Sequence, residues 1–108
     1  MRTEDLKGGS LDVLIIALCR DYARRVREIE NAYVGRRTLA ELRYLNIKVL
    51  WAASEVVGER YAEAFVREIG EGIGYAKSEL MDHMSEVSYK RYKTLIKENI
   101  AKKLHLAE

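Results

Sequence analysis

Apolar residues recur along most of the chain at intervals of three and four positions, which is the spacing of one face of an α-helix. The apolar–polar alternation typical of strands never lasts more than a few residues. The chain has no proline, and its seven glycines mark the breaks between helical stretches. We therefore predict an all-α fold, a compact bundle of about five helices in one domain spanning residues 1–108.

The first two predicted helices are the longest. The first begins at Ser10, a good N-cap, and ends near Tyr33, with Gly35 as the stop. The second starts where Thr38 and Glu41 match a capping box, and it ends at the next glycine. Trp51 lies off the inward stripes, which comprise Leu11, Leu14, Ile15, Leu18, Tyr22, Val26, Ile29, Leu42, Leu45, Val49, Ala52, Ala53 and Val56.

Gly58 separates the second helix from a third over residues 59–69, and these three helices form a scaffold over residues 10–69. The glycine-rich stretch that follows predicts an irregular turn, since a phosphate loop needs a preceding strand and a Gly-Lys-Ser/Thr ending. A short fourth helix is expected over residues 75–83, and Ser85 caps a fifth. The inward residues of these helices are Tyr61, Ala62, Phe65, Val66, Ile69, Ala76, Leu80, Val87, Tyr92, Leu95 or Ile96, Ile100 and Leu104.

The composition is that of a soluble domain able to bury a core. Hydrophobic residues make up 48% and charged residues 33% of the 108 residues. No apolar run approaches the ~20 residues of a membrane span, and the polar N-terminus is unlike a signal peptide. We therefore expect no membrane partner and a cytoplasmic location. Cys19, the only cysteine, lies in an apolar stretch and is expected to be a buried thiol.

Charge is unevenly distributed, although the formal net charge is only +2. Residues 1–58 carry ten basic and eight acidic side chains, and residues 59–84 carry three and six. Residues 85–108 carry six basic and three acidic side chains, an excess of three positive charges beside an acidic segment. Such asymmetry can orient a protein on a polyanion.

The C-terminal segment has the layout of a helix-turn-helix over residues 75–105. Residues 75–84 would form the support helix, Ser85 the turn and cap, and residues 86–104 the reading helix. The side chains predicted to approach base edges are Ser88, Arg91 and Thr94. Those predicted to contact the phosphate–sugar backbone are Tyr89, Lys90, Lys93 and Lys97. Double-stranded DNA is the predicted partner.

The same segment resembles the closing helix of small phage-encoded transcriptional regulators of the ArpU-like, sigma-region-4-like kind. The residues that carry the resemblance are Ser85, Ser88, Tyr89, Arg91, Tyr92, Lys93, Ile96, Ile100, Ala101 and Leu104. It covers about a quarter of the chain, and it departs from the family in a tighter turn at residues 83–85 and in the glycine-rich linker. The resemblance implies promoter or operator binding, with residues 88–91 at the start of the reading helix.

Other interpretations of the basic residues stay open. A lysine-rich face is also typical of an ordinary amphipathic last helix, and Tyr89 and Tyr92 also suit the core or its rim. A second basic cluster is either a solvated face with ion pairs or a second surface for phosphate or an acidic protein. Its members are Arg20, Arg24, Arg25, Arg27, Arg36 and Arg37.

No catalytic or metal-binding pattern is found. His83 and His105 are far apart in sequence and no zinc-ligand spacing is present, so we expect no enzyme, cofactor or metal. The leading hypothesis is a small phage or mobile-element DNA-binding protein that regulates transcription. A homodimer is also considered, because one short helix rarely supplies enough specific contact. The alternative is a helical protein-interaction module, an inhibitor or adaptor of a larger nucleic-acid enzyme, with an exposed apolar patch around Leu50 and Trp51.

Overall fold

The computed structural model describes residues 9–31 and 35–106, and in these ranges it contains helices and turns but no strand. Its elements are α1 (Ser10–Arg20), α2 (Tyr22–Asn31), α3 (Arg36–Val57), α4 (Glu59–Glu71), the 3-10 turn η2 (Tyr75–Lys77) and α5 (Glu86–Lys103). The predicted all-α fold, a compact bundle of five helices, is confirmed for the described residues.

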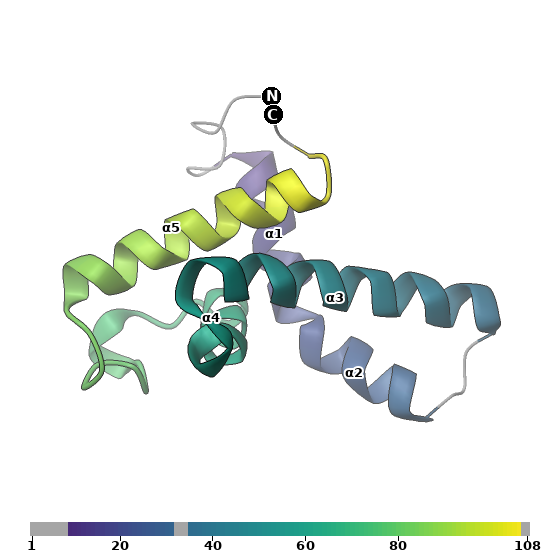
Figure 1. Ribbon diagram of the computed structural model, residues 1–108, viewed down its shortest axis with the longest axis horizontal. Coiled ribbons are helices and arrows are strands. Elements are labelled where there is room, and N and C mark those ends of the chain that lie inside the picture. The colour runs from purple at the N-terminus through teal and green to yellow at the C-terminus, as the bar shows by residue number, and fades with distance from the viewer. Residues whose placement is uncertain (1–8, 32–34, 107–108) are drawn as a thin grey trace.

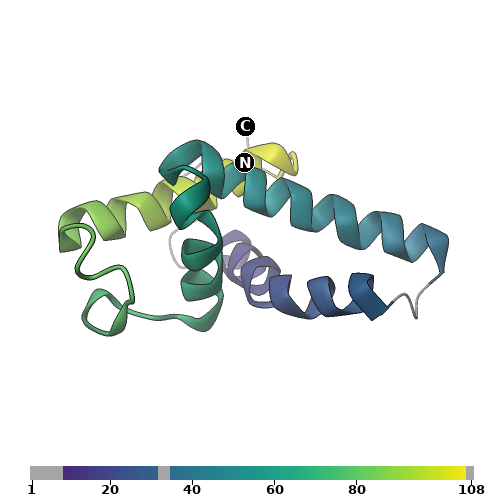
Figure 2. The same ribbon diagram turned by 60° about the horizontal axis from the view of Figure 1, so that its bottom comes forward.

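α3 contacts all of the other helices, and α4 lies beside it near the centre of the molecule (Figure 1). α4 contacts α3 and α1, and α5 lies across both of these helices. α2 packs beside α3, and the two extend away from the centre as a two-helix arm (Figure 2). The principal-axis extents are 43 × 32 × 21 Å, so the molecule is flat and its arm is only one helix pair thick.

The core forms where the apolar stripes of α1, α3, α4 and α5 meet. Phe65 of α4 stacks on Tyr89 of α5, with ring centroids 5.4 Å apart. Removal of these apolar surfaces from water is the main driving force of folding. The buried apolar residues are Leu11, Ile15, Cys19, Val49, Ala52, Ala53, Ala62, Phe65, Val66, Ile69, Leu80, Tyr89, Ile96, Ile100 and Ala101. The predicted burial of the Cys19 thiol is thus confirmed.

The first predicted helix is broken at Asp21 into α1 and α2, which the apolar spacing did not indicate. The end of α4 crosses the chain at this point. A Cβ added to Gly70 would lie 2.4 Å from the main-chain nitrogen of Arg20, so only glycine permits this approach. Gly70 therefore lies inside α4 as a contact residue, and the prediction that placed it in a turn is wrong. The predicted end near Tyr33 lies outside the described residues.

The other helix ends agree with the prediction in part. α3 begins directly after Gly35, so Thr38 lies inside its first turn and the predicted capping box is wrong. Gly58 ends α3 as predicted, with a φ of +82° that favours glycine. α4 continues to Glu71, two residues past the predicted end, and Gly72 then ends it with a φ of +69°.

The predicted fourth helix is wrong. Residues 75–83 form the 3-10 turn η2 followed by further turns. Side chains here take the hydrogen bonds that a helical ladder would make. The Ser78 hydroxyl accepts from the Leu80 amide at 2.9 Å, and the Tyr75 hydroxyl donates to the Met84 carbonyl at 2.7 Å. The predicted support element of the helix-turn-helix is therefore a set of turns and not an α-helix.

Three predicted inward positions face solvent instead. Leu14 and Ala76 are exposed, and Val87 is 76% exposed. Of the alternatives Leu95 and Ile96, Ile96 is the buried one. The buried face of α5 is the one that carries Tyr89 and Ile96. These residues are seven positions apart, which is about two turns of the helix. This rotation decides which of the predicted DNA-contacting side chains can reach a ligand.

Candidate nucleic-acid interface

The start of α5 lies at the edge of the molecule opposite the arm (Figure 1). Ser85 caps it as predicted, since its hydroxyl oxygen accepts a hydrogen bond from the Ser88 amide at 3.2 Å. The free amides of this first turn carry the positive end of the helix dipole. A helix start of this kind can accept a phosphate group once basic side chains surround it.

Tyr89 lies in the core, so its predicted role as a backbone contact is corrected. The residue is 1% exposed, and its hydroxyl donates to Oε1 of Glu68 at 2.6 Å. The same carboxylate accepts from the Ser78 hydroxyl at 2.6 Å and from the Glu79 amide at 3.3 Å. Burial, and secondly the bond to Glu68, raises the pKa of Tyr89 to about 12. This buried Glu68 network joins α4, the turns after η2 and α5.

Two of the predicted phosphate-binding lysines are bound within the protein. Nζ of Lys93 donates to the Ile73 carbonyl at 2.5 Å and lies 4.8 Å from the ring centroid of Tyr89. Burial lowers the pKa of Lys93. Nζ of Lys97 forms an ion pair with Asp12 of α1 at 2.8 Å. Both lysines hold α5 against the rest of the molecule, so they are removed from the predicted contact set.

The remaining four predicted side chains lie on the outer side of α5. Lys90 and Arg91 are exposed, and Ser88 and Thr94 are partly exposed. Lys90 lies 3.3 Å from Glu86 in a solvent-exposed ion pair, a weak contact that a phosphate could replace. Arg91 forms no ion pair with any residue that the structure describes. Their contact with DNA stays a prediction.

The sequence interpretation missed Glu68, which organises this region. The residue follows Phe65 by three positions, so the helical spacing already places a carboxylate on the inward face of α4. A charged residue at an inward position indicates a buried polar partner set, because an isolated buried charge is costly. Its partners Ser78 and Tyr89 could not be identified, since they depend on how the turns fold back.

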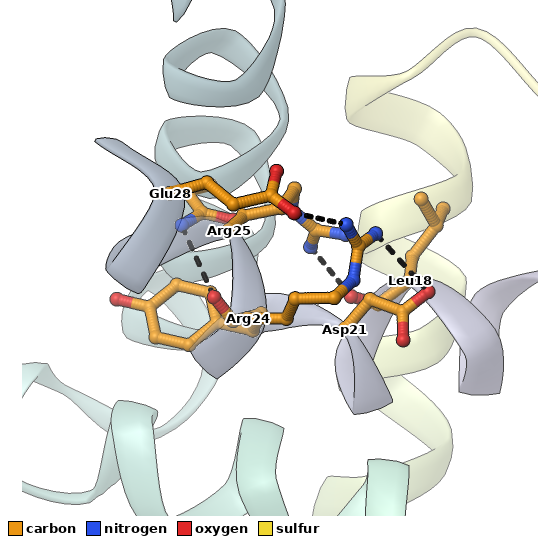
Figure 3. A network of polar contacts seen from close by, with 7 residues as sticks. Leu18, Asp21, Arg24, Arg25 and Glu28 are labelled. Carbon is orange, nitrogen blue, oxygen red and sulfur yellow. Dashed lines mark hydrogen bonds and ion pairs between the residues drawn. The ribbon is translucent and has the colours of Figure 1, made fainter. Parts of the chain in front are cut away.

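The second basic cluster contains side chains that stabilise the fold (Figure 3). Arg24 lies 2.7 Å from Glu28 and 3.7 Å from Asp21 in surface ion pairs. Arg25 is 3% exposed, and its Nε donates to Oδ1 of Asn46 on α3 at 2.5 Å. Burial lowers the pKa of Arg25. Arg25 therefore binds α2 to α3 and to the end of α1, whereas the half-exposed Arg24 pairs only with residues of α2 and the adjacent Asp21.

Other members of this cluster face a cavity of about 310 Å³ between α1–α2 and α4. Arg20 and Arg27 line it from one side, and Arg67, Glu63 and Glu71 line it from α4. Because acidic and basic groups alternate here, the cavity has no strong charge of one sign. Arg67 is in turn ion-paired with Glu79.

The outer face of α3 carries exposed apolar side chains, and we call it the α3 stripe: Tyr44, Ile47 and Trp51, with the charged residues Arg37, Glu41, Lys48 and Glu55 on the same side. Tyr44, Ile47 and Trp51 are 48%, 63% and 45% exposed. Lys48 lies over both aromatic rings, and Lys103 of α5 lies 3.6 Å from the Trp51 ring centroid. The apolar patch expected around Trp51 is therefore present, whereas Leu50 is partly buried.

Comparison of the chain with protein-family models, curated proteins and solved structures finds no match.

Two kinds of feature are absent from the described part of the chain, a metal-holding cluster and a membrane-spanning helix. Among these residues no group of three or more histidine, cysteine, aspartate or glutamate side chains could hold a metal ion. No described helix has both the length and the apolar character needed to cross a bilayer. The outer side of α5 and the α3 stripe are thus the two surfaces to interpret.

Proposed function

We propose that the protein is a small DNA-binding protein that contacts double-stranded DNA with the first half of α5. The observation that carries the proposal is the division of α5 into two sides. One side is bound inward through Tyr89, Lys93 and Lys97, while Lys90 and Arg91 point outward at an exposed helix start.

This arrangement supports the insertion of α5 into the major groove, whose width admits an α-helix. Arg91 is suited to a bidentate contact with guanine, with Ser88 and Thr94 beside it. Lys90 and the amides of the first turn suit phosphates. The Glu68 network supports the helix from behind, in place of the support helix that the sequence predicted. The family resemblance of α5 favours a regulator of transcription in a phage or mobile element.

The proposal is tested with two variants that each remove one exposed arginine. Arg91→Ala is expected to weaken binding to a selected duplex by ~1–3 kcal/mol, measured by fluorescence anisotropy. Arg60→Ala removes the same charge from the exposed side of α4 and is the matched control. Equal affinities of the two variants would show that α5 does not read DNA.

A second candidate function is that of a helical protein-interaction module. The exposed α3 stripe favours it, because exposed aromatic residues within one apolar patch are typical of protein interfaces. This function predicts that Ile47→Glu abolishes capture of a protein partner, whereas Arg91→Ala leaves capture unchanged. The two functions are therefore distinguished by the surface, the α3 stripe or the outer side of α5, at which a substitution abolishes binding.

A further inference from the structure

The α3 stripe has an apolar centre and charged ends. Tyr44, Ile47 and Trp51 follow one another at intervals of three and four residues, so they lie along one line of the helix. The stripe from Arg37 to Glu55 is about 27 Å long at 1.5 Å per residue. Three exposed apolar side chains in line on an otherwise charged helix face indicate a surface that another molecule covers, even though Lys48 lies between the two aromatic rings.

The charges along the stripe alternate in sign and differ at its two ends. Arg37 lies at the start, Glu41 and Lys48 follow, and Glu55 lies at the end. The side chains of Arg37 and Glu55 are 95% and 42% exposed. Each end charge also has a partner in its own chain, since Arg37 lies 3.6 Å from Glu41 and Glu55 lies 2.9 Å from Lys103 of α5. The two end side chains thus differ in sign and stay partly exposed, so each can add a second ion pair with another molecule.

A shallow hollow lies in the first half of the stripe. It is lined by Arg37, Ala40, Glu41, Tyr44 and Leu45. The small side chain of Ala40 lowers the surface between larger neighbours. A flat aromatic side chain from another molecule could fill such a hollow, and the stripe itself presents one in its second half, Trp51.

We propose that the α3 stripe is the interface of a symmetric homodimer, in which α3 packs antiparallel against α3 of a second copy. When Arg37 lies opposite Glu55 of the second copy, Tyr44 comes opposite Lys48 and Trp51 comes opposite Glu41, at the hollow. Each contact occurs twice, because a two-fold axis makes the same surface serve both copies. Ile47 lies close to the axis, where apolar burial is greatest.

The charge order selects both the direction and the partner. A parallel pairing would set Arg37, Lys48 and Glu55 each against the same residue of the other copy, which is repulsive. DNA is not favoured, because Glu41 and Glu55 offset the charges of Arg37 and Lys48 and the apolar Ile47 offers no contact to phosphate. A strongly acidic or strongly basic protein would match only one end of the stripe. A second copy in the antiparallel direction matches both.

The test measures the dimer dissociation constant of the full chain by sedimentation equilibrium. Ile47→Glu is expected to raise this constant by roughly tenfold or more, because it puts two carboxylates beside the apolar axis. Val13→Glu is the matched control, since Val13 is as exposed as Ile47 but lies on α1. It is expected to leave the constant unchanged. Circular dichroism checks that both variants are folded.

Trp51 gives a second readout, because it is the only tryptophan in the chain. Its fluorescence is expected to shift to shorter wavelength as the wild-type protein is concentrated and to stay constant in Ile47→Glu. A second variant, Arg37→Glu, is expected to weaken the dimer by removing the attraction at both ends. Its charge lies at an almost fully exposed position, so folding is not at risk.

Three results would overturn the inference. They are a monomer at every attainable concentration, a dimer that Ile47→Glu and Arg37→Glu leave intact, and a Trp51 shift that appears only on adding duplex DNA. The inference is independent of the proposed function. A monomer that binds DNA would overturn only the dimer, and a dimer that fails to bind DNA would overturn only the proposed function.

Discussion

At the residue scale, the depth of each side chain on α5 decides its role. Tyr89 and Lys93 were expected at a ligand and are used instead for packing and for hydrogen bonds to Glu68 and Ile73. Arg91, two residues after Tyr89, points the other way and is exposed. On one helix, inward residues such as Tyr89 thus stabilise the fold, while outward residues such as Arg91 are available for binding. Each kind of residue can be substituted without changing the other.

Tyr89→Phe removes one donor from the buried Glu68 carboxylate. We expect the free energy of unfolding to fall by about 1–3 kcal/mol, because the carboxylate is left with an unmet hydrogen bond away from water. Tyr92→Phe is the control, since the Tyr92 hydroxyl has no hydrogen-bond partner among the described residues. Urea unfolding followed by circular dichroism measures both, and equal stabilities would contradict the network.

Ile96→Ala and Leu95→Ala test which face of α5 is buried. Ile96 is fully buried, so its truncation should cost about 2–5 kcal/mol of unfolding free energy. Leu95 is exposed, so its truncation should lower the free energy of unfolding by less than about 1 kcal/mol. Chemical denaturation compares them, and a larger loss for Leu95→Ala would mean that α5 is rotated relative to this structure.

Cys19 should make stability fall at alkaline pH. Burial raises the pKa of this thiol from 9.0 to about 12. Above about pH 9 the unfolded chain releases the proton while the folded chain retains it, so the free energy of unfolding falls as pH rises toward about 12. Cys19→Ala, although less stable throughout, should show a shallower fall in urea unfolding at about pH 8 and pH 10. Parallel profiles would contradict a buried thiol.

Much of the core was predictable, because burial follows helical spacing. Ile15, Val49, Phe65 and Ile100 lie inward as their spacing predicts. The polar interior was not predictable. The partners of Glu68 come from turns whose course is set by tertiary packing, and no periodic signal marks such turns.

At the element scale, glycine acts in two different ways in this chain. Gly58 and Gly72 end helices through a positive φ, which sequence patterns indicate well. Gly70 lies inside α4 and allows the main chain of α1 to approach it. Its glycine-rich surroundings suggested a turn, because local sequence does not show that another helix crosses there.

Gly70→Ala should therefore be strongly destabilising. The added Cβ would lie 2.4 Å from a main-chain nitrogen that cannot move without shifting α1. We expect a loss of about 1–3 kcal/mol or more in unfolding free energy. Gly74→Ala is the control, because a Cβ there meets no atom within 4 Å and the φ of −84° suits alanine. A loss as large for Gly74→Ala as for Gly70→Ala would contradict the close crossing of α1 and α4.

The helices were easier to predict than their connections. The long helical stretches and the cap at Ser85 were identified, since periodicity and capping are local signals. The fourth helix was wrong because Tyr75 and Ser78 bond to distant groups, which competes with a helical ladder. The location of the candidate site on α5 could be inferred from local sequence. That Tyr89, Lys93 and Lys97 bind within the protein could not, because their partners are distant in sequence.

At the scale of the whole molecule, two surfaces lie on different elements. The outer side of α5 carries Lys90 and Arg91 at one end of a flat molecule, and the α3 stripe lies on the helix that forms the arm. A two-fold dimer through α3 would carry two copies of the α5 start. Helix-based DNA readers use such pairs to bind two half-sites.

The central claim is that the protein binds duplex DNA through the first half of α5. Its most direct measurement is fluorescence anisotropy of a labelled random-sequence duplex, titrated with the protein over a series of salt concentrations. We predict binding that weakens steeply as salt rises, because phosphate contacts release counterions. The double variant Lys90→Ala, Arg91→Ala should reduce that salt dependence, since it removes two basic contacts. No binding of the wild-type protein at low salt would contradict the account, and so would a double variant that binds as tightly as the wild type.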